Sequence, residues 1–575
     1  MEHVNASRSQ KSDRKRGSDW VELFALALLF LAAAVLLFTN LGSKYLWQDE
    51  AATAVLGDRL IKFGKPLAYD GVNLITMDHF AGEDKNTIDQ RTGDPETAVR
   101  YYAEHGDFRR DTAWIGQPWG QFVAVGVSLK LFGHNTVGAR MPFAVAAALT
   151  VGLLYWFVRR QFNDPLLAWL ATFILITNVY WVVHCRQCRY YALSGLFLML
   201  TLIAFTRWQR GRPWGAVLFI VTAWCWFQVD FGSFWPMLAI LLLSAALAAR
   251  PHVKHVLVVS IALGAAIAPW VWYYELVNRV KTSAAPWPDK FLLNLLHFNQ
   301  FLIPLLLILL AAVILAVRWR SLDHMRRRIL SVSLAMLLAA LLWVPSVTPY
   351  VFYRYIVHLT PLAALIAAWV LNECANWIIR GHRQGSRILV AGSLAVFIVV
   401  CPHLSNMVAT LSPGSVPEAY PLGLVVRPEW TVLHEEVFAP RPDPNRLTVE
   451  ALSRIASPKD EILTNYEDIP LMFYTDYRIR GGIPCFRVED TNGVPPRFLV
   501  YRRSVADVHV AVFNREIMRY RWGLIHSGIP DIPWGNIPEP EFRVGINASS
   551  APEILFAENL GPATLNQTQA DTTER

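Results

Sequence analysis

Long apolar runs separated by short polar gaps fill most of the first 400 residues of the chain. A helix needs roughly 20 apolar residues to cross a bilayer with all of its backbone groups satisfied. By that criterion the pattern predicts about eleven membrane spans. They lie near residues 20–40, 139–158, 164–182, 192–207, 213–229, 233–249, 254–272, 298–317, 328–344, 356–372 and 387–404. We therefore expect a polytopic α-helical membrane protein.

One apolar segment, residues 117–132, is too short for a span of ordinary length. We predict that it forms an amphipathic helix at the outer membrane interface, with Trp114 and Trp119 at the level of the lipid headgroups. Residues 41–137 then form one long outer loop. Loops of that length are usually functional.

Composition and charge support this organisation, since the chain is 54% hydrophobic and only 17% charged. The net charge of +8 arises largely from basic residues in alternate gaps between apolar runs, which is the positive-inside pattern. Those gaps contain Arg159 and Arg160, Arg207, Arg210 and Arg212, Arg318 and Arg320, and Arg383 and Arg387. The basic excess therefore orients helices, and we expect no nucleic-acid partner.

The same alternation divides the chain into three parts. We predict a basic cytoplasmic tail at residues 1–19, a transmembrane catalytic domain at 20–404 and an extracytoplasmic soluble domain at 405–575. In the last part, residues 461–463 and 497–501 are predicted strands and residues 468–474 a predicted helix, which indicates a small α/β domain. The polar residues from about Gly561 onward are expected to be disordered.

Three groups of ionisable residues lie at the predicted outer ends of spans, where charges mark functional sites. The first is Asp49 and Glu50, in the sequence Trp-Gln-Asp-Glu-Ala that opens a helix-like run. Carboxylates in the first turn also complement the helix macrodipole without any further role. Both interpretations remain open from the sequence alone.

The second group contains Arg186 and Arg189, three residues apart. On a helix they would share one face, a geometry suited to binding a phosphate, whereas the alternative is a pair of interfacial arginines. Cys185, Cys188 and His184 lie in the same stretch. No second ligand pair at suitable spacing follows, so we expect buried thiols and no metal site.

The third group is the aromatic stretch from Tyr350 to Tyr355, in which Arg354 is the only basic residue. An aromatic belt with one anchoring residue would have the same composition. Together the three groups predict an outward-facing site that contains a carboxylate and several arginines.

The order of these motifs resembles that of the GT-C glycosyltransferases, particularly the protein O-mannosyltransferase and aminoarabinose transferase branches. The resemblance covers about the first 400 residues and depends on four motifs in order. These are W-Q-D-E-A at 47–51, G-x-x-x-x-G-A-R-M-P-F at 133–143, R-x-x-R-x-Y-x-L at 186–193, and Arg354-Tyr355 followed by Pro361. Where the family often has His-Pro-Pro after its acidic loop, this chain has Gly-Gln-Pro-Trp at 116–119.

The resemblance implies transfer of a sugar from a polyprenyl-phosphate carrier to an acceptor hydroxyl at the outer membrane face, with inversion. Asp49 would be the general base and Glu50 its support. The remaining residues that the family pattern assigns to substrate binding are Arg140, Arg186, Arg189, Tyr191, Arg354 and Tyr355. No cofactor or divalent metal is expected.

Several alternatives stay open from the sequence. A polytopic transporter or lipid flippase is the main rival class, although we find none of the internal repeats typical of transporters, and the charges cluster at one face. The sugar is not identified, and the acceptor could be a glycolipid, a glycan or a protein. We expect the protein in a bacterial inner membrane, with the N-terminus in the cytoplasm.

Overall fold

The structure is a computed structural model of the whole chain. It describes residues 22–75, 108–248, 253–278, 286–348, 351–379, 385–397, 429–439, 443–481, 495–503, 517–532, 536–537 and 551–563. The predicted cytoplasmic tail, the acidic and Arg-Tyr-Tyr parts of the first loop (residues 78–84 and 100–102) and Tyr350 lie outside these ranges.

Each predicted span coincides with a helix or with a bent pair of helices. Five helices of the described chain are long and apolar enough to cross a membrane, or up to seven if each bent pair is one span. The five are Thr136–Phe162 (α6), Tyr191–Gln209 (α9), Val253–Tyr273 (α12), His324–Val347 (α15) and Val357–Ile378, which includes α16 (Thr360–Ile378). Shorter apolar helices are Glu22–Phe38, α5 (Gly120–Phe132), α10 (Gly215–Phe227), α11 (Phe231–Ala248) and Gly385–Phe397. The chain is thus a multi-pass membrane protein, whereas the number eleven remains a prediction.

Two of the predicted spans are broken rather than straight. α7 (Pro165–Thr177) and α8 (Val179–Cys185) meet at 67°, and the side chain of Asn178 between them accepts a hydrogen bond from the backbone N–H of Trp181. The second break, of 84°, separates Trp287–Leu302 (α13 and η3) from α14 (Leu305–Arg318). At this second break Pro304 precedes α14, where its missing N–H removes no helical hydrogen bond.

The first loop is built around α2 (Gln48–Phe63), which packs along α5. Gly57 and Gly126 lie at the crossing, where a Cβ on Gly126 would lie 2.5 Å from the carbonyl oxygen of Gly57. Only glycine allows the two backbones to approach so closely.

Most of the segment 117–132 forms the helix α5, as predicted, whereas its position at a membrane interface stays a prediction. The exposed face of α5 is mainly apolar, with Val123, Val127 and Leu131 on it, and Lys130 is its exposed charged residue. Trp114 is 1% exposed and lies inside the loop rather than at a membrane surface. Two polar residues of α5, Gln121 and Ser128, are buried, and Ser128 donates to the carbonyl oxygen of Gly138 on α6 at 2.6 Å.

The C-terminal region contains a five-stranded mixed sheet in the order β2-β1-β3-β5-β4. Its strands are β1 (Glu461–Thr464), β2 (Arg478–Gly481), β3 (Phe498–Tyr501), β4 (Tyr520–Ile525) and β5 (Leu555–Pro562). β1 pairs in parallel with β2 and β3, and β5 pairs antiparallel with β3 and β4. Helices α18 (Glu429–Val437), α19 (Pro444–Ile455) and α20 (Asp468–Tyr474) accompany it. The α/β composition and the three predicted elements are confirmed. β5 extends past Gly561, where the sequence analysis expects disorder to begin.

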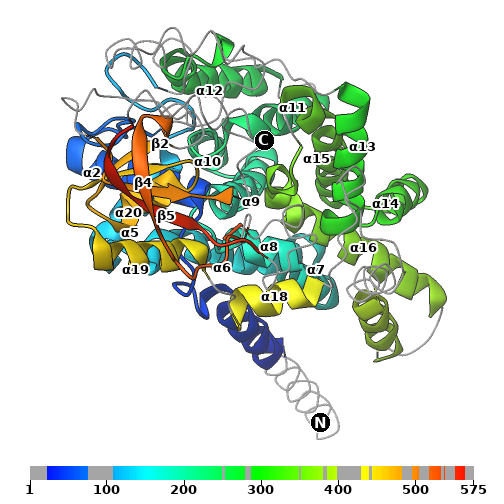
Figure 1. The fold of residues 1–575 in the computed structure, drawn as a ribbon. Helices are drawn as coiled ribbons and strands as arrows, with labels where there is room; N and C mark the ends of the chain where they lie inside the picture. The colour runs from blue at the N-terminus through cyan, green and yellow to red at the C-terminus, as the bar shows by residue number, and fades with distance from the viewer. Residues whose placement is uncertain are drawn as a thin grey trace, which may run out of the picture.

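This region lies directly against the first loop, where α20 packs on α2 (Figure 1). One contact involves the sheet edge at β2. The side chain of Asn73 donates to the carbonyl oxygen of Tyr477 at 3.1 Å and accepts from the backbone N–H of Ile479 at 2.8 Å. The two parts of the protein are therefore joined by specific polar contacts.

Candidate active site

Asp49 lies in the first turn of α2, and two arginines from distant parts of the chain meet its carboxylate. Its Oδ2 lies 3.3 Å from Nη2 of Arg189 and 3.6 Å from Nη1 of Arg354. Three of the predicted site residues thus lie together.

Arg189 is fixed by α2 as well as by the Asp49 carboxylate. Its Nη1 donates to the carbonyl oxygen of Asp49 and to Oγ1 of Thr53, both at 3.2 Å. The Asp49 charge raises the pKa of Arg189 against the opposing effect of burial, so the side chain remains a cation.

Arg354 is held by aromatic rings. Its guanidinium carbon lies 4.3 Å from the ring centre of Phe352, 5.6 Å from that of Tyr355 and 5.7 Å from that of Trp47. Such cation–π contacts orient a charged group. Tyr355 therefore lies beside Arg354.

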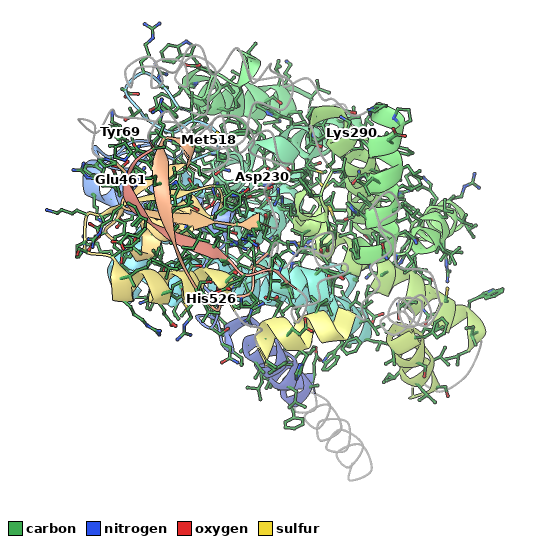
Figure 2. All side chains as sticks on the ribbon, in the orientation of Figure 1. Tyr69, Asp230, Lys290, Glu461, Met518 and His526 are labelled. Carbon is green, nitrogen blue, oxygen red and sulfur yellow. The ribbon has the colours of Figure 1, made fainter. Side chains whose placement is uncertain are left out.

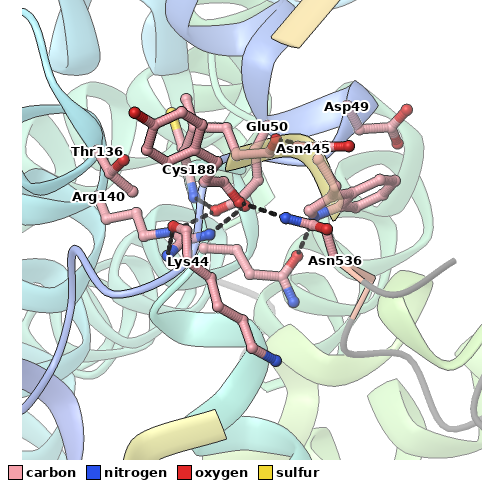
Figure 3. Close-up of polar contacts among 12 residues, drawn as sticks. Lys44, Asp49, Glu50, Thr136, Arg140, Cys188, Asn445 and Asn536 are labelled. Carbon is pink, nitrogen blue, oxygen red and sulfur yellow. Dashed lines mark hydrogen bonds and ion pairs between the residues drawn. The ribbon is translucent and has the colours of Figure 1, made fainter. Parts of the chain in front are cut away.

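Glu50 points away from Asp49, although the two residues are adjacent in the sequence. Its carboxylate accepts from Nε of Arg140 at 2.8 Å, from Nη2 of Arg140 at 2.6 Å and from the backbone N–H of Cys188 at 2.7 Å (Figure 3). Glu50 is 0% exposed. The pair joins α2, α6 and the segment that carries Arg189, so both residues support the site without facing it.

Arg186 lies apart from Arg189, and the prediction that the two share a helix face is wrong. Residues 186–190 form a turn between α8 and α9, because α8 ends at Cys185. The guanidinium of Arg186 donates instead to the carbonyl oxygens of Leu36 and Thr39, at the end of the helix Glu22–Phe38. Burial, with a smaller contribution from Arg140, lowers the pKa of Arg186 to about 10.

Tyr191 and the cysteines occupy the interior behind the site. The Tyr191 ring packs 4.7 Å from Tyr190 and 5.7 Å from His184, measured between ring centres. Cys185 and Cys188 are buried free thiols, and burial raises the pKa of Cys188 well above its usual value. No group of three or more His, Cys, Asp or Glu side chains arranged to hold a metal occurs among the described residues.

The sequence reasoning missed a buried carboxylate between two spans. Asp230, labelled in Figure 2, is 8% exposed and accepts from the hydroxyls of Ser194 at 3.0 Å and Ser233 at 2.5 Å. It immediately precedes α11 and also accepts from the backbone N–H of Ser233, which is an N-cap arrangement. The pattern Asp-x-x-Ser before an apolar run could have revealed this structural role.

The sequence reasoning also missed how closely the C-terminal region approaches Asp49. Nε2 of Gln48, the residue before Asp49, donates to Oδ1 of Asp468 at 2.5 Å. Glu467 is fully buried beside it, and burial raises the pKa of its carboxyl to about 8, against the opposing charge of Arg502. Contacts between residues more than 400 positions apart leave no local signal in a single sequence.

No known protein family matches the sequence, and neither does any curated protein. The fold, however, is similar to that of solved structures. The crystal structure of ArnT from Cupriavidus metallidurans bound to undecaprenyl phosphate has a TM-score of 0.53 and 13% identity, over 94% of this chain and 98% of that chain. The apo structure of the same protein has a TM-score of 0.51 and 14% identity, over 85% of this chain and 94% of that chain.

The oligosaccharyltransferase of Archaeoglobus fulgidus in its apo form is similar at a lower TM-score of 0.47, with 11% identity over 88% of this chain and 73% of that chain. The similarity to the two ArnT structures, which extends over nearly the whole chain, shows that the chain has the GT-C fold. This confirms the fold that the four ordered motifs predict.

Proposed function

We propose that the protein is a GT-C glycosyltransferase that moves a sugar from a polyprenyl-phosphate carrier to an acceptor hydroxyl at the outer face of a bacterial inner membrane. The observation that supports this best is the meeting of Asp49 with Arg189 and Arg354. A carboxylate and two arginines supply both the base and the phosphate-binding groups that the reaction requires. The ArnT structure bound to undecaprenyl phosphate supports a lipid carrier of this kind.

Asp49 acts as the general base in this proposal. An alcohol is a weak nucleophile, so a base must take its proton as the new bond forms. The acceptor hydroxyl donates to the carboxylate of Asp49. The hydroxyl oxygen then bonds to the anomeric carbon, its proton passes to Asp49, and the bond from the anomeric carbon to the phosphate oxygen breaks. A single displacement of this kind inverts the anomeric centre.

Arg189 and Arg354 bind the carrier phosphate and stabilise the charge that it gains on leaving. Fixed donors placed where charge develops are usually the largest contribution to such a step. Arg140 and Glu50 act behind the site, where they hold α2 against the segment that carries Arg189. The metal independence expected from the sequence is part of the proposal, since the arginines supply the positive charge.

The proposal is tested by sugar transfer from a radiolabelled polyprenyl-phosphate donor with Asp49→Asn. The variant keeps the size of the side chain and loses the base, so we expect turnover to fall by about 100-fold or more. Asp58→Asn is the matched control, because Asp58 lies on the same helix and pairs with Lys62. Turnover of Asp49→Asn close to that of Asp58→Asn would show that Asp49 is not the base.

A further inference from the structure

The segment that leads into Asp49 has almost no secondary structure of its own. Residues 45–47 are neither helix nor strand, and α2 begins only at Gln48. Buried backbone N–H and C=O groups need hydrogen-bond partners. The partners of Tyr45 and Leu46 therefore determine where the segment lies.

All four backbone groups of Tyr45 and Leu46 bond to side chains of the C-terminal region. The N–H of Tyr45 donates to Asp443 Oδ2 at 2.5 Å, and the N–H of Leu46 donates to the Tyr474 hydroxyl at 3.0 Å. Their carbonyl oxygens accept, both at 3.1 Å, from Nδ2 of Asn536 and of Asn445 respectively.

These four side chains are themselves held in place. Nδ2 of Asn536 also donates to Asp443 at 2.6 Å, and Asp443 caps α19 by accepting from the backbone N–H of Arg446. The Tyr474 hydroxyl bonds to Oγ1 of Thr136 at 2.7 Å. A connected, buried network of this kind fixes a backbone more rigidly than apolar packing does.

Two further contacts extend this hold to both ends of the segment. The ring of Tyr45 stacks on that of Tyr474 at 3.7 Å between ring centres and packs against the hydrophobic core of the C-terminal domain. The side chain of Gln48 donates to Asp468, which is 1% exposed and begins α20. Gln48 is adjacent to Asp49, so the last contact lies one residue before the proposed base.

We infer that the C-terminal domain is a positioning element for Asp49, with Asp443, Asn445, Tyr474 and Asp468 as positioning residues; the inference rests on the proposed function. The domain sets the path of residues 45–48, and this path sets the direction of the Asp49 carboxylate toward the acceptor. A displacement of about 1 Å in such a group can cost roughly 100-fold in rate. Arg354 comes from another segment, where the rings of Phe352 and Tyr355 contact it independently of residues 45–48.

The hydrogen bonds from the C-terminal domain to Tyr45 and Leu46 are tested without any assay of sugar transfer. The measurement is hydrogen–deuterium exchange of the peptide that contains these two residues, in the full-length protein. Tyr474→Phe removes the acceptor of the Leu46 N–H and keeps the aromatic ring. We expect exchange of this peptide to become at least about tenfold faster, the effect of losing about 1.4 kcal/mol of protection. Tyr477→Phe, in the same domain, keeps the backbone carbonyl that Asn73 contacts and is the matched control. Equal exchange rates in the two variants would show that the C-terminal domain does not fix the backbone of Tyr45 and Leu46.

The effect on Asp49 is tested with Asp468→Leu and Asp468→Asn. Leu cannot accept from Gln48, whereas Asn keeps an acceptor oxygen of the same size. We expect Asp468→Leu to lower kcat at least tenfold with unchanged affinity for the polyprenyl phosphate, and Asp468→Asn to restore kcat. If Asp468→Leu gave less folded protein, and the folded fraction had normal kcat, Asp468 would be only structural and the inference would be wrong. Wild-type protein that transfers no sugar would contradict the proposed function, while the exchange result would still decide whether the hold exists.

Discussion

Glu50 and Arg140 form a two-point ion pair at 2.8 and 2.6 Å in which Glu50 has no exposure to solvent. The pair is the centre of the support behind the site, whereas Asp49, one residue away, faces the arginines of the site. Adjacent carboxylates on one helix turn thus serve different purposes. The first prediction follows from this division.

Glu50→Ala should destabilise the protein by about 3–5 kcal/mol, because it leaves Arg140 buried without its counter-charge. The measurement is thermal or denaturant unfolding of the purified protein in detergent. Glu450→Gln is the control, since Glu450 forms an exposed pair with Arg446 and should change stability by less than about 1 kcal/mol. Similar effects for the two variants would show that the Glu50 pair is not a support.

Arg354→Ala should weaken binding of a polyprenyl phosphate by about 10- to 100-fold, because hydrogen bonds to charged groups contribute roughly 1.5–3 kcal/mol. Arg186→Ala should change this affinity by less than about threefold, since Arg186 bonds to the carbonyl oxygens of Leu36 and Thr39. Titration of each purified variant with the lipid phosphate measures both. Equal losses of affinity would place Arg186 in the phosphate site after all.

Gly57→Ala should destabilise the protein by about 1–3 kcal/mol, because its Cβ would lie 2.3 Å from Cγ1 of Val125 and 2.9 Å from the carbonyl oxygen of Phe122. Gly264→Ala in α12 is the control, since a Cβ there meets nothing within 4 Å. Unfolding measurements on the two variants decide the point. A neutral Gly57→Ala would mean that α2 and α5 cross less closely than the structure has them.

Stability should fall between about pH 5 and pH 8.5 because of Glu467. Burial raises the pKa of this carboxyl from 4.5 to about 8, so the folded state binds the proton more tightly than the unfolded state. The resulting stabilisation is complete below pH 4.5 and is lost as the pH rises through 8. Arg502 favours the charged form, and Asp468 and Asp443 oppose it.

Glu467→Gln should remove this dependence and should be more stable than wild type at high pH by about 1–3 kcal/mol. The melting temperatures of wild type and Glu467→Gln across the pH range measure this difference. The other titrating groups are the same in both proteins, so their contributions cancel. Parallel curves for the two proteins would show that Glu467 does not titrate in this range.

The sequence predicted the elements better than the contacts between them. Apolar length identified the apolar helices, and the predicted elements at 461–463, 468–474 and 497–501 match β1, α20 and β3. The ordered motifs also led to Asp49, Arg189 and Arg354, which lie together. Local patterns were sufficient in these cases because each depends on neighbouring residues.

Where tertiary structure overrides the local pattern, the predictions were wrong or incomplete. Helical spacing put Arg186 beside Arg189, but α8 stops at Cys185 and a turn separates the two side chains. The hold on Tyr45 by Asp443 joins positions 398 residues apart. A single sequence contains no signal for a contact of that separation.

The contact of Asn73 with β2 has a consequence for the behaviour of the protein in solution. β2 is the outermost strand on its side of the sheet, and an uncovered edge of this kind offers free N–H and C=O groups to a strand from another molecule. Asn73 occupies the groups of Tyr477 and Ile479 that such a strand would need. One amide side chain thus blocks this edge against pairing with a strand of another molecule.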